Sequence, residues 1–230
     1  MKIKITLFTI SAIFFAWILT GCNFVKSNKA ASSAMDDIHE IIDDESWETG
    51  SSSNDNSVKA MEAYMALLRS GITFYSTENK KNYKLNKFTF DNGYEMDEPH
   101  EVHRYTFIQL YGDEVPTLVL ELSAGGNGAF EVLRYQEGTV YGFNFGYRAL
   151  LDLSADGTSY GSSGASAGSY QRLTIEKDIC KEEILCYSES NRDGSVSYFI
   201  GDKKVTWSDY NSFSSSIGTK DVVWHDFTND

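Results

Sequence analysis

The chain has little proline, histidine or cysteine, and it has far fewer basic than acidic residues. Its 230 residues include 2 prolines, 4 histidines and 3 cysteines, with 20 Lys and Arg against 33 Asp and Glu. The net charge of −13 disfavours nucleic acid and anionic lipid headgroups as partners, because Lys and Arg hold phosphate groups. The composition, 41% hydrophobic and 23% charged, is that of a globular protein and excludes a collagen, a coiled coil or a fully disordered chain.

Residues 1–21 have the pattern of a secretory signal peptide. A short basic start, Met1–Lys4, precedes an uncharged, largely apolar run, Ile5–Leu19. These 15 residues would span only about 22 Å as a helix, which is less than the roughly 30 Å hydrocarbon core of a bilayer. The pattern therefore favours a cleaved signal over a permanent transmembrane helix.

The tetrapeptide Leu19-Thr20-Gly21-Cys22 resembles the lipobox of bacterial lipoproteins. This resemblance implies cleavage after Gly21, lipidation of Cys22 with a palmitate-type anchor, and retention on the outer face of the cell membrane. Two acyl chains on one residue would give a stable membrane anchor. We therefore expect an extracytoplasmic lipoprotein whose processed chain carries 18 basic and 33 acidic residues.

Residues 22–56 are rich in Ser, Asn, Asp and Glu and are predicted to be a tether. Within it, Met35–Trp47 places acidic residues around three isoleucines. This segment is either a docking peptide, a divalent-ion binder or an acidic spacer, and the spacer is the simplest interpretation. We expect one globular domain over residues 57–230.

The domain is predicted to be α+β, with an N-terminal helix packed on a mainly antiparallel meander sheet. Ser57 is the expected helix cap, and the apolar residues after it have helical spacing up to Ile72. A period of two then predicts strands at 83–90, 102–111, 117–122, 129–136, 139–153, 170–176, 183–189 and 196–200. Hairpin turns are expected at Glu137-Gly138, Asp156-Gly157 and Asp193-Gly194. A short C-terminal helix, capped by Thr206 or Ser208, precedes a final strand at 222–227.

Two segments suggest a ligand surface. Residues 139–153 place aromatic side chains on one face, either as core beneath the helix or as an exposed platform, and a bend is expected near Gly146. Ten of the 18 glycines lie between Gly125 and Gly168, and the run Gly161–Gly168 is predicted to be a flexible loop that either covers a ligand or simply connects strands. The candidate ligand surface therefore comprises Tyr147, Arg148, Tyr160, Tyr170 and Arg172.

Signatures of catalysis are lacking. The chain has neither a Gly-x-Ser-x-Gly elbow nor a phosphate-binding loop, and His100 and His103 are three residues apart, which suits a surface pair better than a metal site. Cys180 and Cys186 form a disulfide if a turn brings them together, and on one extended strand they are free thiols. We expect no catalytic residue, no metal and no cofactor.

A second resemblance concerns the domain itself. The segments Phe107–Leu120, Val132–Phe143, Phe145–Arg148, Asp193–Ile200 and Val223–Thr228 resemble blocks of uncharacterised lipoproteins from Gram-positive gut bacteria. That family has an Asp-rich turn, of which this chain keeps only Gly112-Asp113-Glu114 and Pro116, too few ligands for calcium. The resemblance implies no activity. The sequence favours a non-enzymatic module for a protein, glycan or small solute, with an envelope assembly subunit or an envelope hydrolase as alternatives.

Overall fold

The computed structural model describes residues 51–69, 71–85, 101–123, 128–146, 148–164 and 167–228. The expected signal peptide, Cys22, most of the tether, His100 and Tyr147 lie outside the described residues. The described chain is α+β, as predicted, with two helices and twelve strands that form two sheets. No helix in these ranges is both long and apolar enough to cross a membrane.

Helix α2 (Ser51–Leu68) packs through one stripe of apolar side chains. Ala60, Tyr64 and Leu67 are fully buried in the hydrophobic core between α2 and the first sheet, which we call the first core. The Tyr64 hydroxyl also donates to the Pro116 carbonyl at 2.9 Å and accepts from the Tyr135 amide at 2.7 Å, which ties the helix to the sheet. The predicted cap at Ser57 is wrong, because α2 begins at Ser51 and takes in the end of the predicted tether.

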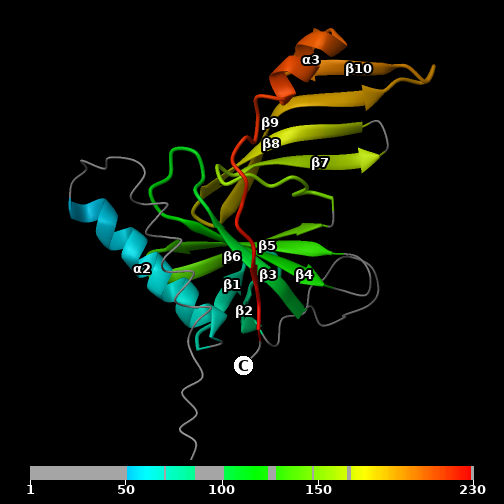
Figure 1. The fold of residues 1–230 in the computed structure, drawn as a ribbon. Coiled ribbons are helices and arrows are strands. Elements are labelled where there is room, and N and C mark those ends of the chain that lie inside the picture. Colours follow the sequence, from blue (N-terminus) through cyan, green and yellow to red (C-terminus); the bar gives the residue numbers. More distant parts are fainter. Residues whose placement is uncertain are drawn as a thin grey trace, which may run out of the picture. The chain divides into compact units, whose positions relative to one another are not determined.

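The first sheet has seven strands in the order β12-β3-β4-β5-β6-β1-β2 (Figure 1). The predicted antiparallel meander is present from β3 to β6, and all other neighbours are also antiparallel except β1 and β6, which are parallel. The strands are β1 (Phe74–Ser76), β2 (Lys81–Tyr83), β3 (Glu101–Ile108), β4 (Thr117–Ser123), β5 (Ala129–Gln136), β6 (Thr139–Gly146) and β12 (His225–Asp226).

The second sheet has five antiparallel strands in the order β11-β10-β9-β8-β7, with helix α3 (Trp207–Ser214) beside β10 (Figure 1). Its strands are β7 (Thr158–Gly164), β8 (Ala167–Glu176), β9 (Ile179–Ser190), β10 (Val196–Ile200) and β11 (Lys203–Val205). The prediction of one sheet is therefore wrong. The expected flexible loop at Gly161–Gly168 is also wrong, since residues 161–164 belong to β7 and residues 167–168 to β8, which pair with each other.

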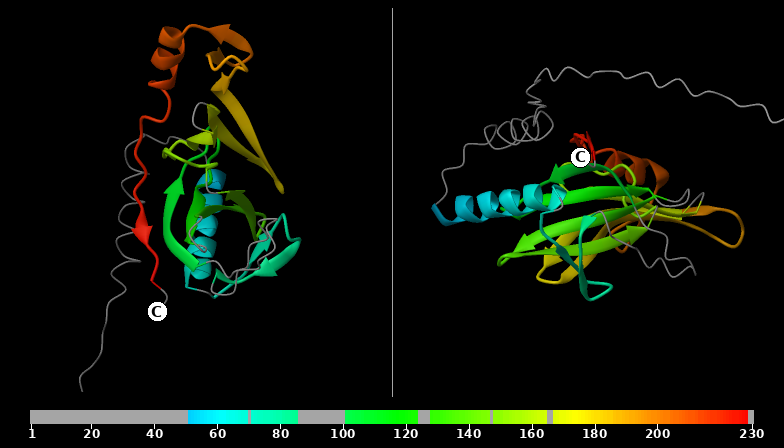
Figure 2. Two further views of the ribbon diagram at one scale, coloured as in Figure 1. Left: turned by 90° about the vertical axis from the view of Figure 1, so that its right-hand side faces the viewer. Right: turned by 90° about the horizontal axis from the view of Figure 1, so that it is seen from below.

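Two cores lie on opposite faces of the first sheet. On β4, Leu118, Leu120 and Leu122 point into the core beneath α2, whereas Val119 points into the core shared with the second sheet. Figure 2 shows α2 along one face of the first sheet. We call the core between the two sheets the second core. In it, Leu173 of β8 is fully buried against side chains of β4, β5 and β6.

The aromatic face of β6 is core, but it does not lie beneath the helix. Phe143 and Phe145 are buried in the second core, and Tyr141 packs against it. The other face of β6 turns toward α2, where Gly142 leaves room for the Phe74 ring, whose nearest atom would be 2.6 Å from an added Cβ. Gly142 therefore permits close packing on this face, while the aromatic residues of the other face hold the two sheets together.

The ends of several elements differ from those predicted. Strand β6 stops at Gly146, because the Ala149 amide donates to the Gly146 carbonyl and turns the chain toward β7. The final strand is reduced to β12, and Val222 and Trp224 before it pack against the second core. The turn at Glu137-Gly138 has φ of 49° and 85°, as a tight hairpin requires.

Both described cysteines are free, so the disulfide alternative is wrong. They lie on the same strand, β9, where extended backbone separates residues that are six positions apart. Cys186 is fully buried, and Cys180 is partly buried, with burial raising the pKa of its thiol to about 12.

Candidate ligand-binding surface

A pair of tyrosines lies on the outer face of the second sheet, the face turned away from the second core. Tyr160 of β7 and Tyr170 of β8 are directly opposite in the ladder, and their ring centroids are 5.1 Å apart. Gly168 makes this arrangement possible, because a Cβ at that position would overlap the Tyr160 hydroxyl. The small residues that resemble a loop in the sequence therefore serve to seat an aromatic ring.

Helix α3 and strand β10 add three aromatic residues to the same face. Thr206 caps the helix, its hydroxyl accepting from the Asp209 amide at 3.2 Å, and this places Trp207 and Tyr210 over β10. The Tyr198 ring lies 5.1 Å from Trp207 and 5.2 Å from Tyr210. The Trp207 side chain remains 57% exposed, whereas Tyr210 is buried.

The strand register places the Tyr160–Tyr170 pair on the same face of the second sheet as the α3–β10 aromatic cluster. Tyr170 is opposite Cys186, Cys186 is opposite Ile200, and Tyr198 precedes Ile200 by two residues. Tyr210 reaches between the groups and is hydrogen-bonded to Cys186. The five aromatic residues thus form a continuous surface, which we call the aromatic strip; it consists of Tyr160, Tyr170, Tyr198, Trp207 and Tyr210.

The aromatic strip is uncharged at neutral pH. Burial raises the pKa of the Tyr170 and Tyr210 hydroxyls above their ordinary value, and burial likewise raises the pKa of the Cys186 thiol. These groups are therefore neutral hydrogen-bonding partners. Such a surface offers aromatic faces and hydroxyls in a chain that is otherwise strongly acidic.

The structure brings together only part of the sequence-predicted ligand surface. Tyr160 and Tyr170 are in contact, and Arg172 follows on the same face of β8. The Arg172 guanidinium lies 4.4 Å from the centroid of the Tyr111 ring and 3.8 Å from a Glu183 carboxylate oxygen. Arg148 is exposed at the edge of β7, where its carbonyl accepts from the Ser162 amide at 3.0 Å.

Sequence reasoning missed the α3 half of the strip. The signals are present in the sequence, since Thr206 is one of the two expected caps and Tyr198 lies on a predicted strand. The sequence does not show that α3 folds back onto β10, because that packing depends on the short strand β11 and on the turn at Gly201.

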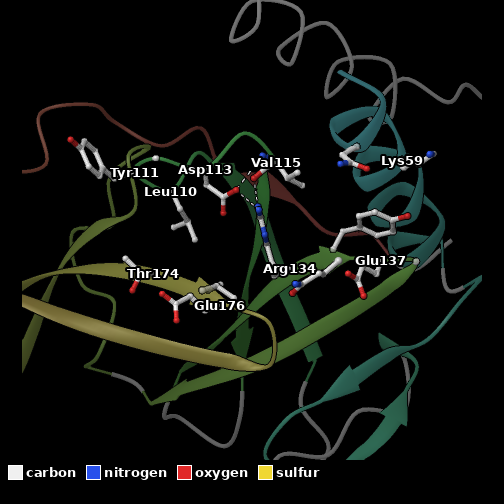
Figure 3. Close-up of a pocket in the computed structure, with 15 residues that line it drawn as sticks. Lys59, Leu110, Tyr111, Asp113, Val115, Arg134, Glu137, Thr174 and Glu176 are labelled. Atoms are coloured by element: carbon white, nitrogen blue, oxygen red, sulfur yellow. Dashed lines mark hydrogen bonds and ion pairs between the residues drawn. The ribbon is translucent and has the colours of Figure 1, made fainter. Parts of the chain in front are cut away.

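A cleft of about 750 Å³ continues the surface beyond Arg172. Along β8, Thr174 and Glu176 line the cleft, and Tyr111 stands at its edge with 72% of its side chain exposed. Figure 3 shows these residues opposite Lys59 of α2 and Glu137 of the β5–β6 turn. The cleft and the aromatic strip are therefore joined along one strand face.

Arg134 organises the wall of this cleft. It makes an ion pair with Asp113, and its guanidinium also donates to the Val115 carbonyl (Figure 3). It donates further to the Pro116 carbonyl at 3.4 Å and to the Thr117 hydroxyl at 3.4 Å. Because both of its terminal nitrogens donate in these bonds, Arg134 holds the loop between β3 and β4 in place. It is a structural residue and not a free anion-binding cation.

The titratable groups of the described residues do not form a catalytic pair. Glu131 of β5 is fully buried, and burial raises the pKa of its carboxyl to about 8. It lies on the α2 side of the first sheet, away from both the cleft and the aromatic strip. Asp156, Glu176 and Asp193 have lowered pKa values instead. The described residues also contain no group of three or more candidate metal ligands.

Comparisons with protein families, curated proteins and solved structures found no match to this chain. The features that bear on its function are therefore the geometry of the aromatic strip and the N-terminal sequence.

Proposed function

We propose that the protein is a lipid-anchored extracytoplasmic module that binds a neutral carbohydrate through its aromatic strip. In this proposal the diacylated Cys22 holds the chain on the outer face of the cell membrane, as in the Gram-positive lipoproteins that the sequence resembles. The acidic tether spaces the domain from the membrane, and the N-terminal helix, the antiparallel meander, the C-terminal helix and the final strand form its scaffold.

The aromatic strip is the observation that supports the ligand class. A pyranose ring has faces of C–H groups and an edge of hydroxyls, so it stacks on electron-rich aromatic faces and forms hydrogen bonds at its rim. Trp207 is the most exposed ring of the strip, and Tyr160, Tyr170 and Tyr198 are partly exposed beside it. Their hydroxyls supply neutral donors and acceptors, and the acidic net charge does not repel a neutral sugar.

The two alternatives have less support. A hydrolase needs two carboxylates with matched pKa values in a cleft, whereas Glu131 is enclosed beneath α2 and has no such partner among the described residues. An assembly subunit needs a contiguous apolar patch. The exposed large apolar residues of the described chain come instead from several elements, and only Ile179 and Ile184, on β9, share one. They are Val58, Ile72, Tyr111, Ile179, Ile184, Trp207 and Val223.

Removal of Trp207 is expected to weaken binding without unfolding the domain. Truncating an exposed aromatic residue at the centre of a binding surface costs about 2 kcal/mol, or roughly 30-fold in affinity. The melting temperature is measured on the chain from residue 22 onward, which Cys22→Ser keeps in solution. It is recorded in the presence of neutral cell-wall fragments and of host glycans. Divalent ions and EDTA are added in separate samples. A ligand at a hundredfold excess over its Kd stabilises the folded state by about 2.7 kcal/mol.

Trp207→Ala should abolish most of this ligand-induced shift, whereas Tyr75→Ala, which removes a paired aromatic residue from the first sheet, should retain it. A panel in which no neutral glycan raises the melting temperature of the wild-type protein would contradict the carbohydrate proposal. A shift of equal size in both variants would place the binding site elsewhere.

Replacement of Cys22 tests the anchor. In cells fed labelled palmitate, the wild-type protein should carry label and sediment with membranes, while Cys22→Ser should lose the label and leave the membrane fraction. Cys180→Ser serves as the matched control, because it removes a thiol from the folded domain. Label retained in Cys22→Ser, or lost in Cys180→Ser, would refute lipidation at Cys22.

A further inference from the structure

Strand β6 has an edge that its neighbour covers only in part. β5 pairs with β6 along its whole length, but β1 pairs on the other side only at Tyr141 and Gly142. The Thr77 amide then donates to the Gly142 carbonyl at 3.0 Å. Because alternate residues of a strand direct their backbone groups to the same side, the N–H and C=O of Asn144 point to this edge as well. Within the described chain no strand pairs with them.

Strand β9 has a second edge of this kind. β8 pairs with β9 from Ile179 onward, whereas β10 pairs with it only from Cys186 to Ser190. The stretch Ile179–Ile184 therefore has no strand neighbour on its outer side among the residues that the structure describes. Ile179 and Ile184 are 55% and 53% exposed, although isoleucine is among the residues that are most often buried.

Both edges line one groove of about 800 Å³. Phe143–Gly146 of β6 form one part of its wall, and Asp178–Cys180 at the start of β9 form another. The charged side chains in the lining are Glu78, Asp178 and Glu182, all of them carboxylates. We call this feature the edge groove. It combines unpaired backbone groups, apolar side chains and a single sign of charge.

We propose that the edge groove binds an extended cationic peptide segment of another protein as an added β-strand. Unpaired strand edges accept an incoming strand through main-chain hydrogen bonds, while alternate side chains of that strand supply specificity. Lysine or arginine at every second position would face the carboxylates, and apolar residues between them would meet Phe145 and Ile179. A second copy of this chain is disfavoured as the occupant, because the groove and the chain are both acidic.

This inference does not depend on the carbohydrate proposal, since none of the strip residues lines the groove. The probe is an acetylated and amidated peptide of four Lys-Val repeats, titrated by calorimetry into the chain from Cys22 carrying Cys22→Ser. Two further peptides carry N-methyl groups on either all valines or all lysines. Each blocks the main-chain donors along one edge of the peptide while its charge is unchanged.

The proposal predicts that one N-methylated peptide binds at least tenfold more weakly than the unmodified peptide while the other is less affected. The double variant Asp178→Asn/Glu182→Gln should also bind at least tenfold more weakly. Glu189→Gln/Asp202→Asn, which removes the same charge from exposed positions outside the groove, should bind within about twofold of the wild type. Hydrogen exchange of the Asn144 amide should slow when the peptide is bound.

Three results would overturn the proposal. Equal binding of all three peptides would show attraction by charge alone. Equal weakening in the two double variants would show that the peptide does not use this groove. Concentration-dependent dimerisation of the chain, with protection of the Asn144 amide in the absence of peptide, would assign the edge to self-pairing.

Discussion

Glu131→Gln is expected to stabilise the protein by about 4 to 5 kcal/mol above pH 8 and to change its stability little near pH 4. The Glu131 carboxyl is fully buried between β4 and β6, and one oxygen accepts from the Asn144 side-chain amide at 3.1 Å while the other has no partner among the described residues. Burial therefore raises its pKa to about 8 in the folded state, against about 4.5 in an unfolded chain.

The sign of the pH dependence follows from this difference. Below about pH 4.5 the carboxyl is protonated in both states, and it contributes no penalty. As the pH rises toward 8, the unfolded chain releases the proton and the folded protein retains it, so the free energy of unfolding decreases. Glutamine is neutral at every pH and keeps the bond to Asn144, so the variant lacks this loss.

Thermal melts of the wild type and Glu131→Gln between pH 4 and pH 9 provide the measurement. For a chain of this size a gain of 4 to 5 kcal/mol corresponds to about 10 to 15 °C in melting temperature. Glu62→Gln, an exposed change on α2, should follow the wild type at all pH values. A lower melting temperature of Glu131→Gln at pH 8 would show that the charged carboxylate is stabilised by a partner, contrary to this account.

Arg134→Met is expected to destabilise the protein by about 3 to 5 kcal/mol. The guanidinium is the common partner of the Asp113 carboxylate and of the Val115 and Pro116 carbonyls, in a wall where little of its side chain is exposed. Methionine fills the same volume but leaves a partly buried carboxylate without a cation and carbonyls without donors.

Urea unfolding of three variants separates these contributions. Arg134→Lys keeps the charge but lacks the planar fork, so it should cost less than Arg134→Met. Asp113→Asn added to Arg134→Met should recover part of the loss, because it removes the uncompensated charge. If Arg134→Lys were as stable as the wild type, the fork geometry would have no role. If Asp113→Asn made Arg134→Met worse, the penalty would not come from the unpaired carboxylate.

The strands that the sequence predicts well are those next to clear turn signals. Residues 129–136 and 196–200 become β5 and β10 without change, since Glu137-Gly138 ends the first and Asp193-Gly194 precedes the second. The antiparallel pairing of consecutive strands also follows from short connections such as Glu137-Gly138.

The division into two sheets could not be predicted in the same way. β7 is made of Gly, Ser, Thr and Tyr, and its strand conformation comes from pairing with β8 and from the ring of Tyr160 over Gly168. Nor does local sequence reveal that Phe143 packs on the second sheet and not on α2, because both partners are apolar and distant along the chain.

The candidate site shows the same limit. Tyr160 and Tyr170 were predicted because they bracket a glycine run, and they do meet, although on a hairpin and not around a loop. Trp207 and Tyr210 were missed because their place beside Tyr198 depends on how α3 folds back on β10. Contacts between elements determine this surface, whereas periodicity describes only the elements themselves.

An NMR titration with neutral cell-wall glycan fragments, followed by the indole N–H signals of Trp207 and Trp224, shows whether the aromatic strip binds a ligand. Trp224 is an internal control, since it packs against Phe130 and under the Arg104 guanidinium, 4.5 Å from its ring centroid. If the glycan stacks on the strip, the Trp207 signal moves in a saturable manner while the Trp224 signal stays in place. A saturable shift of Trp224 without one of Trp207 would contradict such stacking, as would a titration in which neither signal moves.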